Sequence, residues 1–190
     1  MANIAFAEGE TKYTSPVDKV IADMTKAIED NPGNAVIYCK RGSAYKSKKL
    51  YDLALADYNK ALEINPNYAY AYAGRALVYS KKDDNNAAIN DYSKAIELDP
   101  TYVLSYNNRA TAYSKKEQYD LAINDFKKAI ELDSKHMISY AGLAIVYEKK
   151  YLYDDAIAVY RKLIDNATMP QDKVWVEKAQ NKIREFGGTL

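Results

Sequence analysis

The sequence predicts an all-α protein, a solenoid of antiparallel helix pairs stacked one on another. Three observations support this prediction: a period of 34 residues, apolar positions three or four residues apart, and a short polar break within each period. Residues 88–100 read AINDYSKAIELDP, and residues 122–134 read AINDFKKAIELDS. Self-similarity at a fixed period of about 20 to 50 residues is typical of proteins built from stacked repeats.

The period continues through four consecutive units. The first half of each unit carries two tyrosines in register, and the second half carries an aromatic residue between two small ones. The aligned positions are Tyr38, Tyr72, Tyr106 and Tyr140; Tyr45, Tyr79, Tyr113 and Tyr147; Ala54, Ala88, Ala122 and Ala156; Tyr58, Tyr92, Phe126 and Tyr160; and Ala61, Ala95, Ala129 and Leu163. Pro66, Pro100, Ser134 and Thr168 close the four units.

Each unit is expected to form two helices joined by a tight turn. In the third unit, Tyr106, Ala110 and Tyr113 share one helical face, and residues 119–129 carry a second stripe with the same spacing. The polar residues 115–118 separate the two stripes, and a proline stops the second helix. Small residues let the paired helices approach closely, while aromatic residues fill the space between neighbouring pairs.

The flanking segments extend the array. Residues 16–32 match a second helix in the same register and are expected to form a half-repeat, with Val20, Met24, Ala27 and Pro32 on the shared positions. Residues 171–186 are expected to form a capping helix, which the end of a solenoid requires. Its side chains expected to cover the last repeat are Val174, Trp175, Ala179 and Ile183. Residues 1–15 are interpreted as an N-terminal tail.

This pattern resembles the tetratricopeptide repeat (TPR) family, which is defined by the same period and the same spacing of large and small positions. The resemblance covers residues 35–168 as four repeats, bounded 35–68, 69–102, 103–136 and 137–170. It implies a right-handed superhelix. The departures are few: Asn85 stands where the other units have Tyr51, Tyr119 and Tyr153, Leu163 replaces an alanine, and Ser134 and Thr168 replace the closing proline.

Composition excludes several classes of function. The chain has 190 residues, a net charge of +1, one cysteine and one histidine. Cys39 and His136 are too few for a zinc site or a Ser/His/Asp arrangement, so neither a metal, a cofactor nor a catalytic residue is predicted. No apolar run approaches the ~20 residues of a membrane helix. The near-zero net charge gives no general reason to expect nucleic acid as a partner.

The nineteen tyrosines suggest a stacking platform at first sight. The repeat register instead assigns fourteen of them to helix contacts: Tyr38, Tyr45, Tyr51, Tyr58, Tyr72, Tyr79, Tyr92, Tyr106, Tyr113, Tyr119, Tyr140, Tyr147, Tyr153 and Tyr160. Of the other five, only Tyr70 falls on a face expected to meet a ligand.

The resemblance to the TPR family implies a concave groove, lined by the first helices, that binds an extended peptide or a short helix. The groove positions in this sequence are Val36, Cys39, Lys40 and Ser43; Tyr70, Ala73, Gly74 and Leu77; Leu104, Asn107, Asn108 and Thr111; and Ile138, Ala141, Gly142 and Ile145. A further position in each repeat holds Ser47, Lys81, Lys115 or Lys149. The predicted function is therefore a non-catalytic scaffold with a protein or peptide partner.

The groove residues indicate the chemistry of such a partner. The apolar side chains, such as Leu77 and Ile145, would admit apolar groups, and Asn107 and Asn108 would hydrogen-bond a peptide backbone. The alternative is that this face packs against a neighbouring molecule or the chain's own tail. The co-chaperone subgroup of the family grips a carboxylate with Lys, Asn and Arg at set positions. Only Asn108 matches that set, so a carboxylate clamp is disfavoured.

Paired lysines end the first helices and suggest a second hypothesis, a basic ridge that binds an acidic partner or nucleic acid. The pairs are Lys48-Lys49, Lys81-Lys82, Lys115-Lys116 and Lys149-Lys150. The competing interpretation is that these cations offset helix dipoles and are neutralised by acids on the second helices, namely Asp57, Asp91, Asp125, Glu63, Glu97 and Glu131. Within residues 88–100, Asp91, Lys94 and Glu97 are expected to face solvent.

Three further expectations concern the ends and the lone residues. A cytoplasmic location is expected, with a periplasmic or secreted location as the alternative if Ala5-Phe6-Ala7 is the remnant of a signal peptide. Pairing of two chains through exposed terminal helices is left open. Cys39 is expected to face the groove, and His136 is expected to be a solvated loop residue.

Overall fold

The computed structural model describes residues 15–189, so all of the predicted tail except Ser15, including Ala5-Phe6-Ala7, lies outside the described residues. Ten α-helices and one short 3-10 helix make up this range, and no β-strand occurs within it. The helices are α1 (Pro16–Asp30), α2 (Ala35–Ser47), α3 (Tyr51–Ile64), α4 (Ala69–Lys81), α5 (Asn85–Leu98), α6 (Val103–Lys115), α7 (Tyr119–Leu132), α8 (Met137–Lys149), α9 (Tyr153–Asn166), η1 (Pro170–Asp172) and α10 (Lys173–Glu185).

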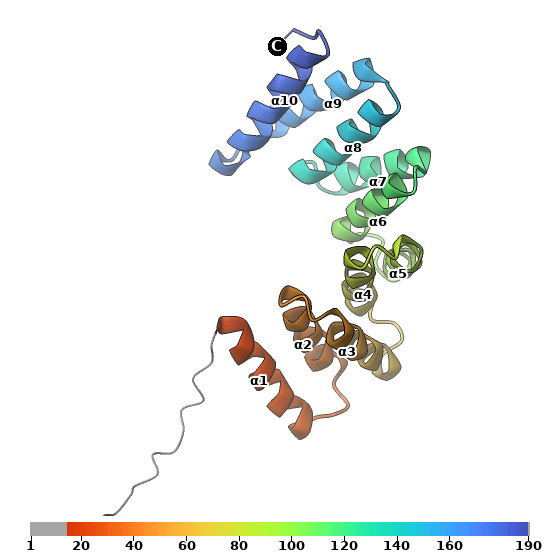
Figure 1. Cartoon of the computed structure of the whole chain (residues 1–190), viewed down its shortest axis with the longest axis vertical. Coiled ribbons are helices and arrows are strands. Elements are labelled where there is room, and N and C mark those ends of the chain that lie inside the picture. Colours follow the sequence, from red (N-terminus) through yellow and green to blue (C-terminus); the bar gives the residue numbers. More distant parts are fainter. Residues whose placement is uncertain (1–14, 190) are drawn as a thin grey trace, which may run out of the picture.

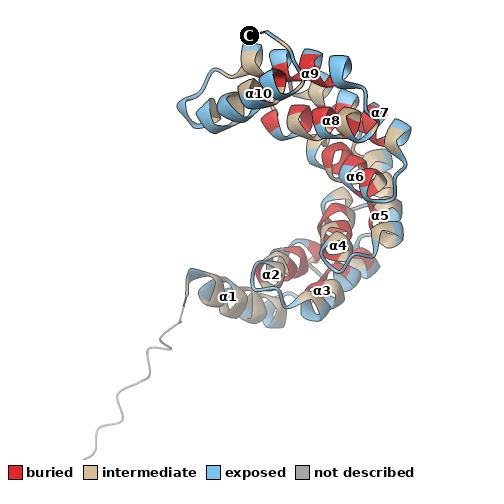
Figure 2. Cartoon of the chain, turned by 45° about the horizontal axis from the view of Figure 1, so that its top comes forward, coloured by how far each residue is buried: buried red, intermediate tan, exposed pale blue. Residues whose placement is uncertain are grey.

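The helices form a crescent of stacked pairs (Figure 1). Each of α2, α4, α6 and α8 packs against the helix that follows it, and each second helix also contacts the first helix of the next pair. The first helices lie on the inner side of the crescent, and α3, α5, α7 and α9 lie on the outer side (Figure 2). The predicted all-α solenoid of helix pairs is therefore confirmed.

The repeated small and aromatic residues form the core between helices. Ala54 and Tyr58 are fully buried, and the residues at equivalent positions of the other repeats are at most 5% exposed. The aromatic rings reach the backbone of the next first helix, where glycine leaves room for them. A Cβ atom added to Gly74 would lie 2.5 Å from the Tyr58 ring, and one added to Gly142 would lie 2.5 Å from the Phe126 ring.

A buried ion pair joins the two helices of each of the first three repeats. The guanidinium of Arg75 donates two hydrogen bonds to the carboxylate of Asp91, at 2.7 and 2.8 Å. It donates a third, at 2.6 Å, to Asn59 of the preceding repeat. Arg41–Asp57 and Arg109–Asp125 repeat this geometry. The expectation that Asp91 faces solvent is wrong, because its carboxylate is held inward by Arg75 and the residue is only 8% exposed.

The turn within each repeat has a backbone in the left-handed region. Lys49, Asp83, Glu117 and Tyr151 have φ angles of 58 to 60°, although none of them is glycine. A hydrogen bond from the amide three residues after the helix to a carbonyl in its last turn closes each turn, as from Leu50 to Tyr45 at 2.9 Å. The four repeats therefore share one turn conformation between their paired helices.

The two end helices fill different roles. α1 contacts the next helix as a second helix would, since Arg41 donates to Thr25 at 3.2 Å and Lys48 pairs with Asp18. Within the described residues it has no helix on its other side, and Val20 is 42% exposed. In α10, Ala179 and Ile183 are buried as predicted.

The expectation that Val174 covers the last repeat is wrong, because this residue is 57% exposed. The buried face of α10 follows the spacing of four residues from Trp175 to Ala179 and Ile183. Val174 precedes that face by one residue, a rotation of about 100° around the helix, and so points to solvent.

Thirteen of the fourteen tyrosines assigned to helix contacts are buried or half-buried. The exception, Tyr153, is 42% exposed, although its ring lies 4.8 Å from that of Phe186. The interpretation of these residues as structural is therefore confirmed for the described part of the core.

Candidate functional site

The inner face of the crescent carries a row of apolar side chains, one or two from each first helix. Tyr70 is 44% exposed, Leu104 and Ile145 are 47% exposed, and Ile138 is 51% exposed. Tyr70, Leu104 and Ile138 lie at equivalent positions on α4, α6 and α8, which follow one another along the inner side of the crescent in Figure 2, and Ile145 lies about two turns further along α8. Exposed apolar side chains gathered on one concave face are typical of a binding surface.

The sixteen predicted groove residues differ in how far their side chains are exposed to solvent. Exposed residues are Val36, Lys40, Tyr70, Leu104, Thr111, Ile138 and Ile145, and half-buried residues are Ser43, Leu77, Asn108, Ala141 and Gly142. Four others, Cys39, Ala73, Gly74 and Asn107, are buried. Cys39 and Asn107 lie beneath the groove, whereas Ala73 and Gly74 form part of the floor of a cavity on the inner face.

Cys39 does not face the groove as expected. Its side chain is fully buried, and burial, with the negative charge of Asp57, raises the pKa of the thiol to about 12. A thiol with such a pKa stays protonated near neutral pH and is a poor nucleophile. Cys39 therefore packs as a small apolar residue.

Asn107 is held in a hydrogen-bonded chain that reaches the turn before α8. Ser139 Oγ donates to Asn107 Oδ1 at 3.1 Å, and Asn107 Nδ2 donates to Asn108 Oδ1 at 3.2 Å. His136 Nδ1 lies 2.7 Å from Ser139 Oγ. The expectation that His136 is a solvated loop residue is wrong, since it is half-buried and burial lowers its pKa. The chain fixes the amide orientation of Asn108, which does reach the groove.

Two adjoining cavities lie along the middle of the inner face. One, of about 210 Å³, is lined by Tyr70, Leu77 and Leu104 among others. The next, of about 310 Å³, lies between α4, α5 and α6 and contains more polar residues. The two cavities share Leu77, Tyr92 and Asn108, so they form one continuous depression.

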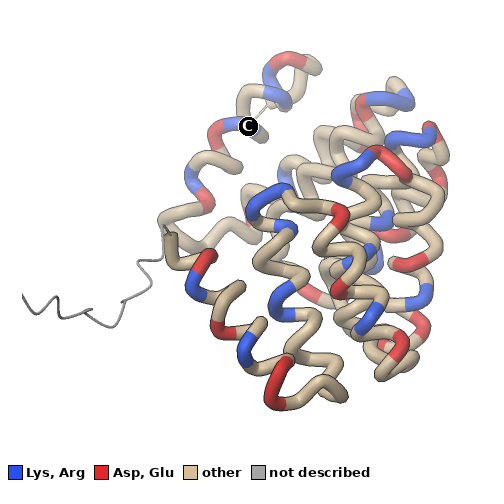
Figure 3. Tube along the Cα trace, turned by 60° about the horizontal axis from the view of Figure 1, so that its bottom comes forward, with Lys and Arg blue, Asp and Glu red and all other residues tan. Residues whose placement is uncertain are grey.

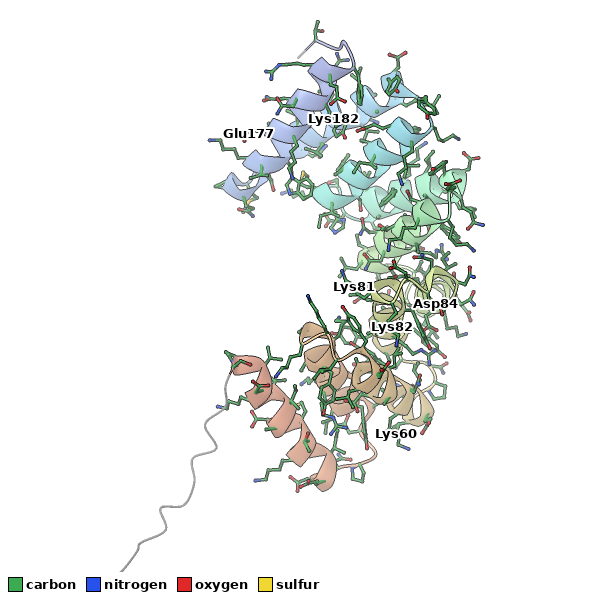
Figure 4. The ribbon with its side chains drawn as sticks, viewed as in Figure 1. Lys60, Lys81, Lys82, Asp84, Glu177 and Lys182 are labelled. Atoms are coloured by element: carbon green, nitrogen blue, oxygen red, sulfur yellow. The ribbon has the colours of Figure 1, made fainter. Side chains whose placement is uncertain are left out.

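A larger cavity, of about 500 Å³, lies at the C-terminal end between α8, α9 and α10. Ile145 and Ala141 line one side, and Trp175 of α10 lines another. Lys182 of α10, labelled in Figure 4, forms an ion pair with Glu148 of α8 at 3.2 Å. The sequence predicts only a capping role for Trp175. Its place on the terminal helix, in register with the groove, was the available signal that it also lines this cavity.

Four of the eight lysines at the ends of the first helices pair with acids, which leaves a smaller basic ridge than the sequence suggests. Lys82 pairs with Asp52 at 2.6 Å, and Lys48 and Lys150 pair with Asp18 and Asp120 at the equivalent positions. Lys115 pairs with Asp83 at 2.8 Å. Basic and acidic residues are interspersed along the chain, as Figure 3 shows.

The acids expected to neutralise these lysines have other partners, which corrects that interpretation. Asp57, Asp91 and Asp125 bind the arginines. Glu63, Glu97 and Glu131 pair with lysines three residues earlier on their own helices, at 2.6 to 2.9 Å.

Lys81 is the exposed cation that remains at the centre of the groove, and Figure 4 places it on the inner side of the crescent. Burial lowers the pKa of Lys46 on α2, and the nearby charge of Lys81 lowers it further. This part of the groove is therefore mildly electropositive.

Two other kinds of feature do not occur within residues 15–189. No group of three or more His, Cys, Asp or Glu residues in that range is placed to hold a metal ion. No helix there is both long and apolar enough to cross a membrane.

Solved structures with the same fold include three proteins, two of which are described with a peptide or a peptide-binding site. MamA is 24% identical with a TM-score of 0.72 and covers 81% of this chain and 95% of its own. YrrB, described as a TPR protein with an unusual peptide-binding site, is 24% identical with a TM-score of 0.69 and covers 86% and 88%. The first TPR domain of Spaghetti (RPAP3), solved with an HSP90 peptide, is 21% identical with a TM-score of 0.61 and covers 62% and 94%. No curated protein sequence matches this chain.

Models of the tetratricopeptide repeat match residues 35–68, 57–90 and 103–136, and a TPR repeat model matches residues 81–117. Together these matches cover residues 35–136 without a gap, and the matches at 35–68 and 103–136 span the helix pairs α2–α3 and α6–α7. The chain therefore belongs to the tetratricopeptide repeat family.

Proposed function

We propose that this protein is a non-catalytic scaffold that binds a peptide, extended or helical, in the groove on its inner face. The observation that carries the proposal is the row formed by Tyr70, Leu104, Ile138 and Ile145, each 44 to 51% exposed and each on a first helix. Exposing apolar side chains to water is unfavourable, and a partner that covered them would recover that free energy.

The neighbouring structures support a peptide rather than a small molecule as partner. YrrB has a peptide-binding site, and the Spaghetti domain holds a peptide of HSP90. The cavities of this groove adjoin one another and follow the row of first helices, which suits a partner whose side chains are spaced along a backbone.

The lysine-ridge hypothesis receives less support. Lys48, Lys82, Lys115 and Lys150 all have acidic partners. A lysine already paired with a carboxylate is less able to neutralise a phosphate and so to release the counterions of a polyanion. Pairing of two chains through α1 is a separate proposal that rests on the exposure of Val20. Sedimentation of the wild type and of Val20→Glu tests it, since a dimer made through α1 would dissociate in the variant.

Selection from a library of random linear peptides tests the groove. We expect enriched peptides to share apolar positions and to lose binding to Leu77→Glu, whose side chain lines both central cavities. The circular dichroism spectrum of Leu77→Glu should match that of the wild type. Enriched peptides that bind Leu77→Glu with unchanged affinity would place their site elsewhere and contradict the proposal.

A further inference from the structure

One repeat departs from the others where Asn85 replaces the tyrosine at the start of the second helix. In the next repeat, Tyr119 occupies this position, and Lys149 Nζ lies 5.9 Å from the centre of its ring. The counterpart of Lys149 is Lys115, which has no ring beneath it and pairs with Asp83 instead. The cavity of about 310 Å³ lies here, lined in part by Asn85.

The side chains around this cavity have unused hydrogen-bonding capacity. Within residues 15–189, four buried side-chain polar atoms have no hydrogen-bond partner, and three of them, Ser80 Oγ, Asn85 Oδ1 and Tyr92 OH, belong to residues that line this cavity. Ser80 and Asn108 lie close enough to the Tyr92 hydroxyl to lower its pKa. Neither side chain forms a hydrogen bond of normal geometry with that hydroxyl. Because these atoms have almost no contact with bulk water, solvent does not satisfy them.

Equivalent groups in the other repeats are satisfied. The hydroxyl of Tyr58 lies 2.9 Å from Ser43 Oγ, the hydroxyl of Tyr160 donates to Glu148, and Phe126 has no hydroxyl. Ser114, the counterpart of Ser80, accepts a hydrogen bond of 3.5 Å from Lys149. The unsatisfied set is therefore a property of this one cavity rather than of the repeat.

The orientation of two amides defines what the cavity offers. Asn85 Nδ2 donates to the carbonyl of Asp83 at 3.2 Å, which leaves Oδ1 as an acceptor. Asn108 Oδ1 accepts from Asn107, which leaves Nδ2 as a donor. Burial raises the pKa of Tyr92 to about 12, so its hydroxyl keeps its proton near neutral pH. The cavity thus presents one fixed acceptor, one fixed donor and two hydroxyls that can take either role.

The charges at the rim exclude two classes of ligand group. Lys81 and Lys115 line the cavity, with one acid, Asp83, between them, so a cationic group would be repelled. An anionic group has no proton to donate to Asn85 Oδ1. A neutral group that both donates and accepts suits both fixed partners, and a primary carboxamide is such a group, with its N–H donors and its acceptor oxygen on separate arms of one planar unit.

We propose that this cavity binds the primary carboxamide of an asparagine or glutamine side chain carried by the peptide in the groove. This inference rests on the proposed function for the origin of the ligand. The long exposed side chains of Lys81 and Lys115 form the rim and move aside as the group enters. The carboxamide N–H then donates to Asn85 Oδ1, and its oxygen accepts from Asn108 Nδ2 or the Tyr92 hydroxyl.

Nuclear magnetic resonance titrations with small probes test the cavity without a peptide. The probes are propionamide, propionate, propylammonium and 1-propanol, and the reporters are the side-chain amide resonances of Asn85 and Asn108. We expect propionamide to bind about tenfold more tightly than each of the other three, since propionate has no proton to donate, propylammonium cannot accept, and 1-propanol must use a single oxygen for both roles. Equal or tighter binding of propionate, propylammonium or 1-propanol, or no shift with propionamide, would overturn the inference.

Three variants locate the site. Asn85→Tyr restores the residue of the other repeats and should abolish the propionamide shifts at Asn108. Tyr92→Phe, which introduces the side chain that the next repeat has at Phe126, should weaken binding by about tenfold. Tyr58→Phe is the matched control, because its hydroxyl is bonded to Ser43 outside this cavity. Unchanged propionamide binding in both Asn85→Tyr and Tyr92→Phe would also overturn the inference.

The peptide experiment separates this inference from the proposed function. Selected peptides should carry Asn or Gln at one position, and replacing it by Glu or Leu should weaken wild-type binding but not binding to Asn85→Tyr. Ile145 lies in the distant cavity beside α10. If Ile145→Glu leaves peptide affinity unchanged while propionamide still binds at Asn85, the groove proposal fails and the carboxamide site stands.

Discussion

The fourth repeat replaces the buried ion pair of the other repeats with two apolar residues. Leu143 stands in the place of Arg109 and Val159 in the place of Asp125, and they are 4% and 8% exposed. This natural substitution predicts how the third repeat responds when its own pair is changed. Asp125→Val alone should be strongly destabilising, whereas Arg109→Leu combined with Asp125→Val should be close to neutral.

The magnitude follows from the contacts of Arg109. Asp125→Val removes two charge-assisted hydrogen bonds, of 2.7 and 2.8 Å, and leaves a guanidinium whose side chain is only 18% exposed. Breaking one partner of a fully buried pair costs about 3 to 5 kcal/mol. The remaining bond to Ser93, at 2.9 Å, and the partial exposure reduce the expected cost to about 2 to 3 kcal/mol. The double variant should lie within about 1 kcal/mol of the wild type.

Urea unfolding followed by circular dichroism measures both free energies, with the slope checked for each variant because repeat arrays can unfold in parts. Glu131→Gln is the control, because its pair with Lys128 is exposed to solvent and should contribute little to stability. A cost below about 1 kcal/mol for Asp125→Val would refute the reasoning. So would a double variant as unstable as the sum of the two single ones.

Three further predictions concern close packing, the buried thiol and alkaline pH. Gly142→Ala should lower the free energy of unfolding by about 1 to 3 kcal/mol, although alanine has the better helix propensity, because the new Cβ would lie 2.5 Å from the Phe126 ring. Urea unfolding of Gly142→Ala, alone and combined with Phe126→Leu, measures this clash. If Phe126→Leu restores no stability to Gly142→Ala, the clash is not the cause. Cys39 is fully buried, so a thiol reagent at pH 8 should label it only in denaturant, and rapid labelling of the folded protein would disprove its burial. Burial raises the pKa of Tyr92 from 10.0 to about 12, so the hydroxyl proton dissociates at lower pH in the unfolded state than in the folded state. Tyr92 should therefore not affect the free energy of unfolding below about pH 10. Between about pH 10 and 12 that free energy should fall by up to about 3 kcal/mol. Tyr92→Phe should reduce this alkaline loss, and an identical pH profile in the variant would contradict the assignment.

The fold was predictable because the residues that build it recur. The positions of Ala88, Tyr92 and Ala95 recur at the same spacing in every unit. A period of 34 residues with two helical stripes fits one architecture, a solenoid of helix pairs. The ion pairs were not recognised, because a surface aspartate and a buried one look alike in a sequence. Asp91 is buried only because Arg75 lies opposite it on the neighbouring helix.

The groove was predictable in outline but not in depth. The sequence shows Asn107 and Asn108 as neighbours on one helix. Only the packing of α8 against α6 determines that Ser139 hydrogen-bonds Asn107 and that Asn108 reaches the groove. The carboxamide cavity had a visible signal in Asn85, the one departure from tyrosine at its position. Its significance depends on Ser80 and Tyr92 lacking partners, which no pattern of residue types reveals.

The most direct test of the peptide-binding groove compares two equally exposed apolar residues on opposite sides of the crescent. Ile145 on the inner helix α8 and Leu121 on the outer helix α7 are both 47% exposed. The measurement is the dissociation constant, by fluorescence polarisation, of one library-selected peptide for wild type, Ile145→Glu and Leu121→Glu. A loss of about tenfold or more in Ile145→Glu alone is the predicted result. Equal affinity for all three proteins, or a loss confined to Leu121→Glu, would contradict a binding site on the inner face.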